Sequence, residues 1–138
     1  MRHDVAMNDR TASCACGLLK ATATGAPVRI SICHCLDCKR RTGSAFGLQS
    51  TWTEEQVTIS GEAREFERFG DDGGNWVREY FCGTCGVRVF YRIELRPGMV
   101  SIPVGAFADP GFPPPTAEVY GERAQAGIGC QLDKDCQE

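Results

Sequence analysis

The chain has 138 residues, of which 42% are hydrophobic and 24% charged, and its formal net charge at neutral pH is −3. This length fits a single domain with a modest core, and the acidic balance argues against a general nucleic-acid-binding protein. No apolar run is long enough to cross a bilayer, and the first ten residues do not resemble a signal peptide. We therefore expect a cytoplasmic protein that binds neither nucleic acid nor membrane.

Apolar and polar residues alternate with period two along much of the chain, while helical periodicity is nearly absent. The expected strands, in chain order, cover residues 19–24, 28–33, 46–52, 57–60, 63–69, 76–81, 87–91, 99–103 and 117–120. Glycine- and proline-rich turns separate them, and one short helix is predicted at residues 36–42, ending at Gly43. The sequence thus predicts an all-β fold: residues 13–120 form the domain, residues 1–12 an N-terminal tail and residues 121–138 a loosely packed C-terminal tail.

Seven of the nine cysteines fall into three tight clusters: Cys14 and Cys16; Cys33, Cys35 and Cys38; Cys82 and Cys85. In a reducing compartment such spacings indicate metal ligands more often than disulfides. A closed structural zinc site takes four ligands, whereas a catalytic zinc keeps three protein ligands and an open position. Seven cysteines therefore fit one structural zinc and one catalytic zinc. The remaining pair, Cys130 and Cys136, lies in the polar tail, and we interpret both as free surface thiols.

The spacing suggests how the cysteines group. Cys82-Gly83-Thr84-Cys85 has the form of a zinc knuckle, and Cys14 and Cys16 point the same way if their segment is extended. Together they would form a four-cysteine site, leaving Cys33, Cys35 and Cys38 as a three-thiolate site. A second partition, in which Cys35 and Cys38 join the knuckle as in a zinc ribbon, is also open. We expect His34 to pack or to support the ligands rather than to bind metal.

Three motifs carry a resemblance to a known family: Ser13-Cys14-Ala15-Cys16-Gly17, the run from Cys33-His34-Cys35 to Thr42-Gly43-Ser44, and Phe81-Cys82-Gly83-Thr84-Cys85-Gly86. In order and spacing they resemble the glutathione-dependent formaldehyde-activating enzyme family. The resemblance implies a β-tent of packed antiparallel sheets stapled by zinc. It also implies that Cys14, Cys16, Cys82 and Cys85 hold the structural zinc, and that Cys33, Cys35 and Cys38 hold the catalytic one.

The expected chemistry follows from the ligands. A zinc ion held by three thiolates acidifies water poorly and prefers a fourth thiolate, which it keeps deprotonated. With the resemblance, this predicts a carbon–sulfur lyase that joins glutathione, or a related thiol, to formaldehyde or a similar small aldehyde. Lys39, Arg40 and Arg41 are candidates to pair with the glutathione carboxylates. The alternative is a non-catalytic, zinc-stapled module that binds another protein. The sequence does not indicate an oligomeric state.

Overall fold

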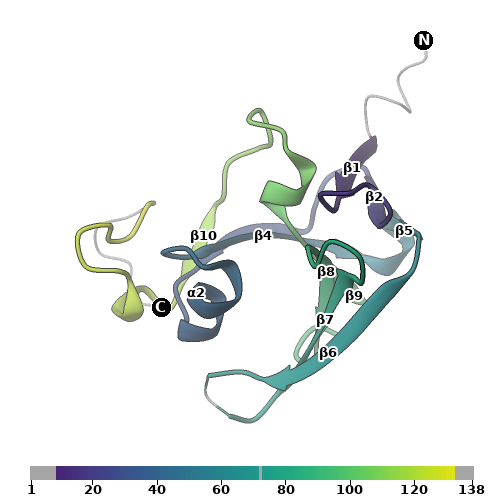
Figure 1. The fold of residues 1–138 in the computed structure, drawn as a ribbon. Coiled ribbons are helices and arrows are strands. Elements are labelled where there is room, and N and C mark those ends of the chain that lie inside the picture. Colours follow the sequence, from purple (N-terminus) through teal and green to yellow (C-terminus); the bar gives the residue numbers. More distant parts are fainter. Residues whose placement is uncertain (1–8, 72, 133–138) are drawn as a thin grey trace.

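The computed structural model describes residues 9–71 and 73–132, and these residues form ten strands with one α-helix (Figure 1). The strands are β1 (Asp9–Ser13), β2 (Lys20–Thr24), β3 (Arg29–Cys33), β4 (Gly47–Thr53), β5 (Val57–Ser60), β6 (Ala63–Phe69), β7 (Trp76–Cys82), β8 (Arg88–Ile93), β9 (Met99–Pro103) and β10 (Ala117–Val119). The helix is α2 (Leu36–Thr42), and short 3₁₀ turns cover Glu54–Gln56, Val104–Phe107 and Gly121–Arg123. The described helix is too short to cross a bilayer.

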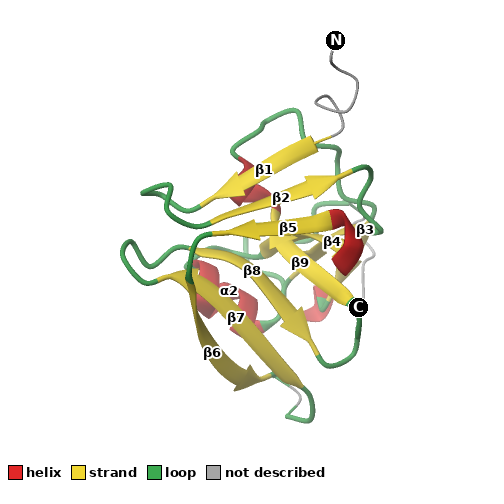
Figure 2. Ribbon diagram, turned by 90° about the vertical axis from the view of Figure 1, so that its right-hand side faces the viewer, coloured by secondary structure: helices red, strands yellow, loops and turns green. Residues whose placement is uncertain are grey.

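The strands form two sheets. One has three strands in the order β1-β2-β5, and the other has seven in the order β10-β3-β4-β9-β8-β7-β6. Figure 2 shows the small sheet at one end of the molecule, with β6, β7 and β8 of the large sheet spreading away from it. Neighbouring strands run antiparallel except β10 and β3, which are parallel. The predicted all-β fold with packed, mainly antiparallel sheets is confirmed.

The core lies between the two sheets, because the alternation gives each of them one apolar face. The small sheet and its loops contribute Ala12, Leu19 and Ala21, and the large sheet contributes Trp52 and Ile102, all fully buried. The buried polar atoms of this region are satisfied in a chain: the Trp52 indole donates to the Ser50 hydroxyl at 2.8 Å, and that hydroxyl donates to the Ile102 carbonyl at 2.8 Å. The packing therefore holds the two sheets as one unit.

Helix α2 has the predicted bounds, and both ends are fixed by side chains or by glycine. The Cys35 sulfur accepts a hydrogen bond from the Cys38 amide at its start, and Gly43 ends it in the left-handed conformation at φ 68°. Asp71, in the loop between β6 and β7, accepts from the amides of Leu36 and Asp37 at 2.6 and 3.0 Å. The far end of the β6–β7 hairpin is thereby attached to the helix that contains Cys38 and is capped by Cys35.

Two segments are more ordered than the sequence predicts. Asp9–Ser13, expected to be mostly tail, forms β1 and pairs along its full length with β2. Only Ala12 of this strand is buried, and the other four residues are polar. The strand therefore lacks the alternation of apolar and polar residues from which the other strands were predicted. The start of the C-terminal tail is also fixed, since the Arg123 guanidinium donates to Asp71 at 3.0 Å. The remaining tail residues, 1–8 and 133–138, lie outside the described residues and include Cys136.

Candidate metal centres and active site

The first cysteine cluster joins the two sheets. Cys14 follows β1, Cys16 lies in the turn before β2, Cys82 ends β7, and Cys85 lies in the turn before β8. Their four sulfurs all lie within 4.8 Å of one another, with Cys14–Cys16 at 3.7 Å and Cys16–Cys82 at 3.6 Å. A tetrahedral site with Zn–S bonds of about 2.3 Å has an edge of about 3.8 Å, so the four sulfurs fit one zinc ion.

Backbone amides support the sulfurs of this cluster as thiolates. The Leu19 amide donates to the Cys14 sulfur at 3.3 Å, and the Thr84 and Cys85 amides donate to the Cys82 sulfur at 3.3 and 3.5 Å. Burial of Cys14 opposes its ionisation, but the Leu19 amide and the neighbouring thiols outweigh burial and lower its pKa to about 6. This arrangement, in which folded backbone presents amides to sulfur, is typical of a structural metal site.

The second cluster lies at the junction of β3 and α2. Cys33 ends the strand, Cys35 caps the helix and Cys38 lies in its first turn, so a strand end and one helical turn bring three sulfurs within 4.8 Å of one another. All three side chains are buried. No other cysteine, histidine or carboxylate among residues 9–71 and 73–132 joins this group. The donor set fits a soft metal with one position left for an outside ligand.

The three thiols of the second cluster differ sharply in acidity. Hydrogen bonds from the Cys33 and Cys35 thiols, with the charge of Arg41, lower the pKa of Cys38 to about 2 despite burial. The same contacts between the sulfurs, together with burial, raise the pKa of Cys33. The contacts among the three sulfurs and with Arg41 therefore favour ionisation of Cys38 over ionisation of Cys33.

His34 does not join the group of three sulfurs. Its ring is fully buried, lies 5.5 Å from the Phe46 ring, and has its Nε2 2.5 Å from a Glu118 carboxylate oxygen. Glu118 also accepts from the amides of Gln131 and Leu132, both at 2.8 Å. His34 therefore connects the cysteine segment to β10 and the C-terminal segment, in keeping with a packing or supporting role. Cys130, expected to be a free thiol, is disulfide-bonded, so that prediction is wrong for Cys130.

The three basic residues predicted to bind glutathione lie in different surroundings. Lys39 donates to the Gln125 side chain at 3.0 Å, and Arg40, 78% exposed, pairs with Asp37 at 3.3 Å. Arg41 is only 13% exposed, and its Nη1 donates to the Cys38 sulfur at 3.5 Å. Of the three, Arg41 is the one in contact with the cysteine cluster.

Two pockets lie near the cluster: Cys33 lines one of them, and Arg41, which contacts Cys38, lines the other. One, of about 500 Å³, lies over the face of β3, β4 and β9, and its lining includes Cys33, Ser31, Thr51, Ser101 and Tyr120. The other, of about 850 Å³, lies between α2 and strands β6, β7 and β8, and its lining includes Arg41, Arg68, Glu79, Phe81 and Arg88. Tyr91 lines the smaller pocket, and its ring centre lies 5.5 and 4.2 Å from the guanidinium carbons of Arg41 and Arg88, which line the larger one.

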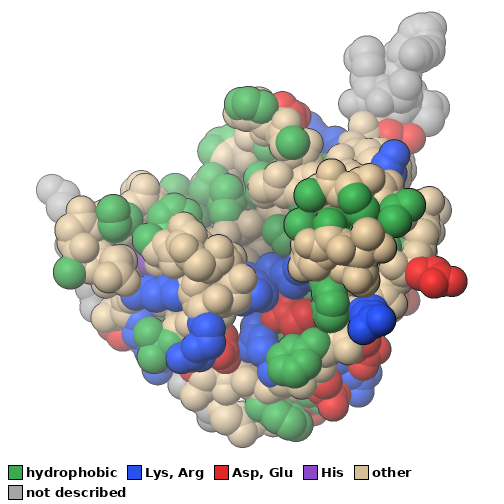
Figure 3. All heavy atoms as spheres, in the orientation of Figure 1, with side chains coloured by type: hydrophobic (Ala, Val, Ile, Leu, Met, Phe, Trp, Pro, Cys, Tyr) green, Lys and Arg blue, Asp and Glu red, His purple; other side chains and the backbone are tan. Residues whose placement is uncertain are grey.

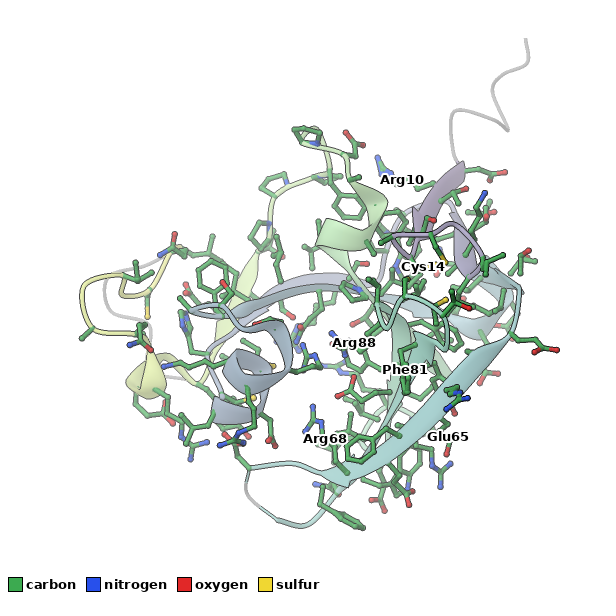
Figure 4. All side chains as sticks on the ribbon, in the orientation of Figure 1. Arg10, Cys14, Glu65, Arg68, Phe81 and Arg88 are labelled. Atoms are coloured by element: carbon green, nitrogen blue, oxygen red, sulfur yellow. The ribbon has the colours of Figure 1, made fainter. Side chains whose placement is uncertain are left out.

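The larger pocket contains residues that the sequence did not single out. Figure 3 shows Lys and Arg side chains gathered around an acidic group in the middle of this face, with hydrophobic side chains beside them. Figure 4 shows Arg68 and Arg88 in the space between α2 and the β6–β7 hairpin. Strand alternation places charged residues on these strands, but it does not reveal that Arg68, Glu79 and Arg88 meet.

A four-sulfur cluster between the sheets and a three-sulfur cluster beside a pocket define a class of protein: a small β domain whose cysteine clusters could hold metal ions. The sequence profile of the glutathione-dependent formaldehyde-activating enzyme family matches residues 9–123, and the chain belongs to that family. The predicted resemblance is confirmed.

A solved structure of a Rhodobacter sphaeroides protein has a similar fold, with a TM-score of 0.57 and 18% sequence identity; the match covers 78% of this chain and 98% of that one. A search of curated proteins found no significant match.

Proposed function

We propose that the protein is a zinc-dependent carbon–sulfur lyase of the synthase type, which joins glutathione or a related thiol to formaldehyde or a similar small aldehyde. The observation that carries the proposal is the buried cluster of Cys33, Cys35 and Cys38, which offers three sulfur donors beside open pockets. The family of the chain supports the thiol and the aldehyde as reactants.

The metal content we propose is two zinc ions per chain. Cys14, Cys16, Cys82 and Cys85 would hold a structural ion, and Cys33, Cys35 and Cys38 a catalytic ion. When bound at the three-sulfur site, zinc supplies a coordination position that favours a sulfur ligand in its thiolate form. With all three sulfurs as thiolate ligands the donor set would carry a charge of −3, and the adjacent Arg41 would offset part of it.

The reaction forms one carbon–sulfur bond. The thiol loses its proton to solvent, its sulfur adds to the carbonyl carbon, and the carbonyl oxygen takes up a proton to give a hydroxymethyl thioether. The chain contributes a buried setting for the sulfur and a side chain, Tyr120, that packs over the cysteines. Among Lys39, Arg40 and Arg41, the position of Arg41 best supports pairing with a substrate carboxylate, while Lys39 and Arg40 could act only from the surface.

The test is the Cys35→Ser variant, with Ser44→Ala, at an exposed position just after the same helix, as the matched control. NMR exchange spectroscopy with ¹³C-formaldehyde and glutathione measures how fast free aldehyde and thioether interconvert. We expect the wild type and Ser44→Ala to accelerate exchange over the uncatalysed rate, and Cys35→Ser to lose at least about 100-fold of that acceleration because the donor set is incomplete. A folded wild-type protein with two zinc ions that does not accelerate exchange would contradict the proposal and favour the protein-binding module.

A further inference from the structure

Three arginines converge on one buried carboxylate in the larger pocket. Glu79, on β7, is 5% exposed, and its oxygens accept from Arg68 Nε at 2.7 Å and from Arg88 Nη1. Arg41 Nε lies 3.9 Å from the same carboxylate. The three arginines come from β6, β8 and α2, so Glu79 holds together guanidinium groups from three separate elements.

The pocket has more positive charge than its own carboxylates balance. Its lining contains Arg40, Arg41, Arg68 and Arg88 but only two acidic residues, Asp37 and Glu79. A guanidinium has five N–H donors, so two carboxylates cannot satisfy four of them. Arg41 has such unsatisfied donors: its buried Nε and Nη2 atoms have no hydrogen-bond partner among the described residues. Unpaired buried donors are costly, and a bound anion would remove that cost.

The other walls of this pocket are apolar. Phe66, Phe81, Val87 and Pro103 make up most of the rest of the lining, with Thr42 and Gly86, and Phe66 is 58% exposed. Apolar walls exclude water around the guanidinium groups and strengthen their attraction for an anion. The pocket therefore suits a carboxylate on a partly apolar molecule better than a fully hydrated inorganic ion.

Arg41 links this pocket to the sulfur site. Arg41 lines the pocket with one side and donates to the Cys38 sulfur with Nη1. We propose that Arg68 and Arg88, positioned by Glu79, bind a carboxylate of the thiol substrate while its sulfur lies at the three-cysteine site. This proposal rests on the proposed function for the sulfur, and it assigns recognition of the substrate carboxylate to Arg68 and Arg88. Glu79 is a positioning residue, since it acts through the two arginines.

The experiment measures dissociation constants by calorimetry on zinc-loaded protein with three probes. Glutathione carries thiol and carboxylates, its diethyl ester keeps the thiol without the carboxylates, and S-methylglutathione keeps the carboxylates without the thiol. The variants are Arg68→Met and Arg88→Met. The control is Arg78→Met, which removes an arginine of β7 that pairs with the half-exposed Glu67 and stacks on Trp76 outside the pocket lining.

We expect the wild type and Arg78→Met to bind glutathione at least about tenfold more tightly than the diester. Arg68→Met and Arg88→Met should weaken glutathione binding by about 10- to 100-fold and leave diester binding unchanged, because each removes a charge-assisted contact. Glu79→Gln keeps both arginines but should also reduce the preference for glutathione over the diethyl ester. This variant replaces an arginine variant that does not fold. A loss of general stability would not change this preference.

The outcomes separate the two proposals. If the arginine variants keep the wild-type ratio of glutathione to diester binding, the carboxylate site is overturned, whether or not thiol addition proceeds. If S-methylglutathione binds with the same arginine dependence but no thiol addition is catalysed, the carboxylate site stands and the proposed function fails. If the wild type binds none of the three probes, both are overturned.

Discussion

Arg41 is the residue that joins the two parts of the candidate site. One of its nitrogens donates to the Cys38 sulfur, and its guanidinium carbon lies 5.5 Å from the centre of the Tyr91 ring. Its charge contributes to the very low pKa of the Cys38 thiol, after the hydrogen bonds from Cys33 and Cys35. A lysine could not make these contacts together, because its single ammonium lacks the planar fork of donors.

Gly61 is a second residue on which the site depends, although it lies outside both pockets. It has φ +96°, and a β-carbon added there would lie 1.9 Å from the Leu18 carbonyl oxygen, in the loop that carries Cys14 and Cys16. We expect Gly61→Ala to lower the free energy of unfolding by about 2–4 kcal/mol, because the alanine must displace backbone and adopt a left-handed conformation. Chemical denaturation measures the change.

The matched control for Gly61 is Gly70→Ala, because Gly70 has an ordinary φ and no atom within 4 Å of an added β-carbon. That variant should change stability by less than about 0.5 kcal/mol. Equal stability for the two variants would show that the close approach of Gly61 to Leu18 does not constrain the cysteine loop.

At the scale of elements, the C-terminal segment is attached to the cysteine segment through Glu118. This carboxylate, 2% exposed, receives hydrogen bonds from the Gln131 and Leu132 amides and contacts His34. Burial alone would raise its pKa, but His34 and the two amides outweigh burial and lower the pKa below 4.5. The carboxylate therefore stabilises the fold above about pH 4.5, and that contribution is lost as the pH falls through its lowered folded-state pKa.

The prediction concerns Glu118→Gln, which keeps the shape of the side chain but not its charge. At pH 7 we expect this variant to unfold with a free energy about 1–3 kcal/mol lower than the wild type, because charge-assisted hydrogen bonds are lost. The difference should shrink as the pH falls below about 4.5 and through the lowered folded-state pKa of Glu118, because the charge that the variant lacks is then lost from the wild type too. A difference that stays constant from pH 7 to pH 4 would contradict the role of the ionised carboxylate.

Several elements could be predicted from the sequence because their signals are local. β5, β6 and β9 have the predicted bounds, and α2 ends at Gly43 as expected. The spacing left two partitions of the seven cysteines open, and the observed grouping into four and three sulfurs is the one that the family resemblance implied. The meeting of Arg68, Glu79 and Arg88 in the larger pocket could not be predicted, because it depends on the register of β6, β7 and β8. Nor could the contact between His34 and Glu118, which lie 84 positions apart.

At the scale of the whole molecule, the four-cysteine cluster brings together two segments that lie far apart in the sequence. Cys16 and Cys82 lie 66 positions apart, and their cluster ties the small sheet to the end of β7. Because a metal at such a site contributes its binding free energy to folding, we expect Cys82→Ser to be unfolded or insoluble. Cys35→Ser should instead keep a cooperative thermal transition. A well-folded Cys82→Ser protein, measured by circular dichroism, would contradict the stapling role.

The most direct test of two metal sites with different roles is the zinc content per chain, measured by native mass spectrometry on protein purified without chelators or added thiol. The account predicts two zinc ions in the wild type and one in Cys35→Ser, with the fold retained in both. A wild-type protein that carries one zinc ion and loses none in Cys35→Ser would contradict it, because the cluster of Cys33, Cys35 and Cys38 would then not be a metal site.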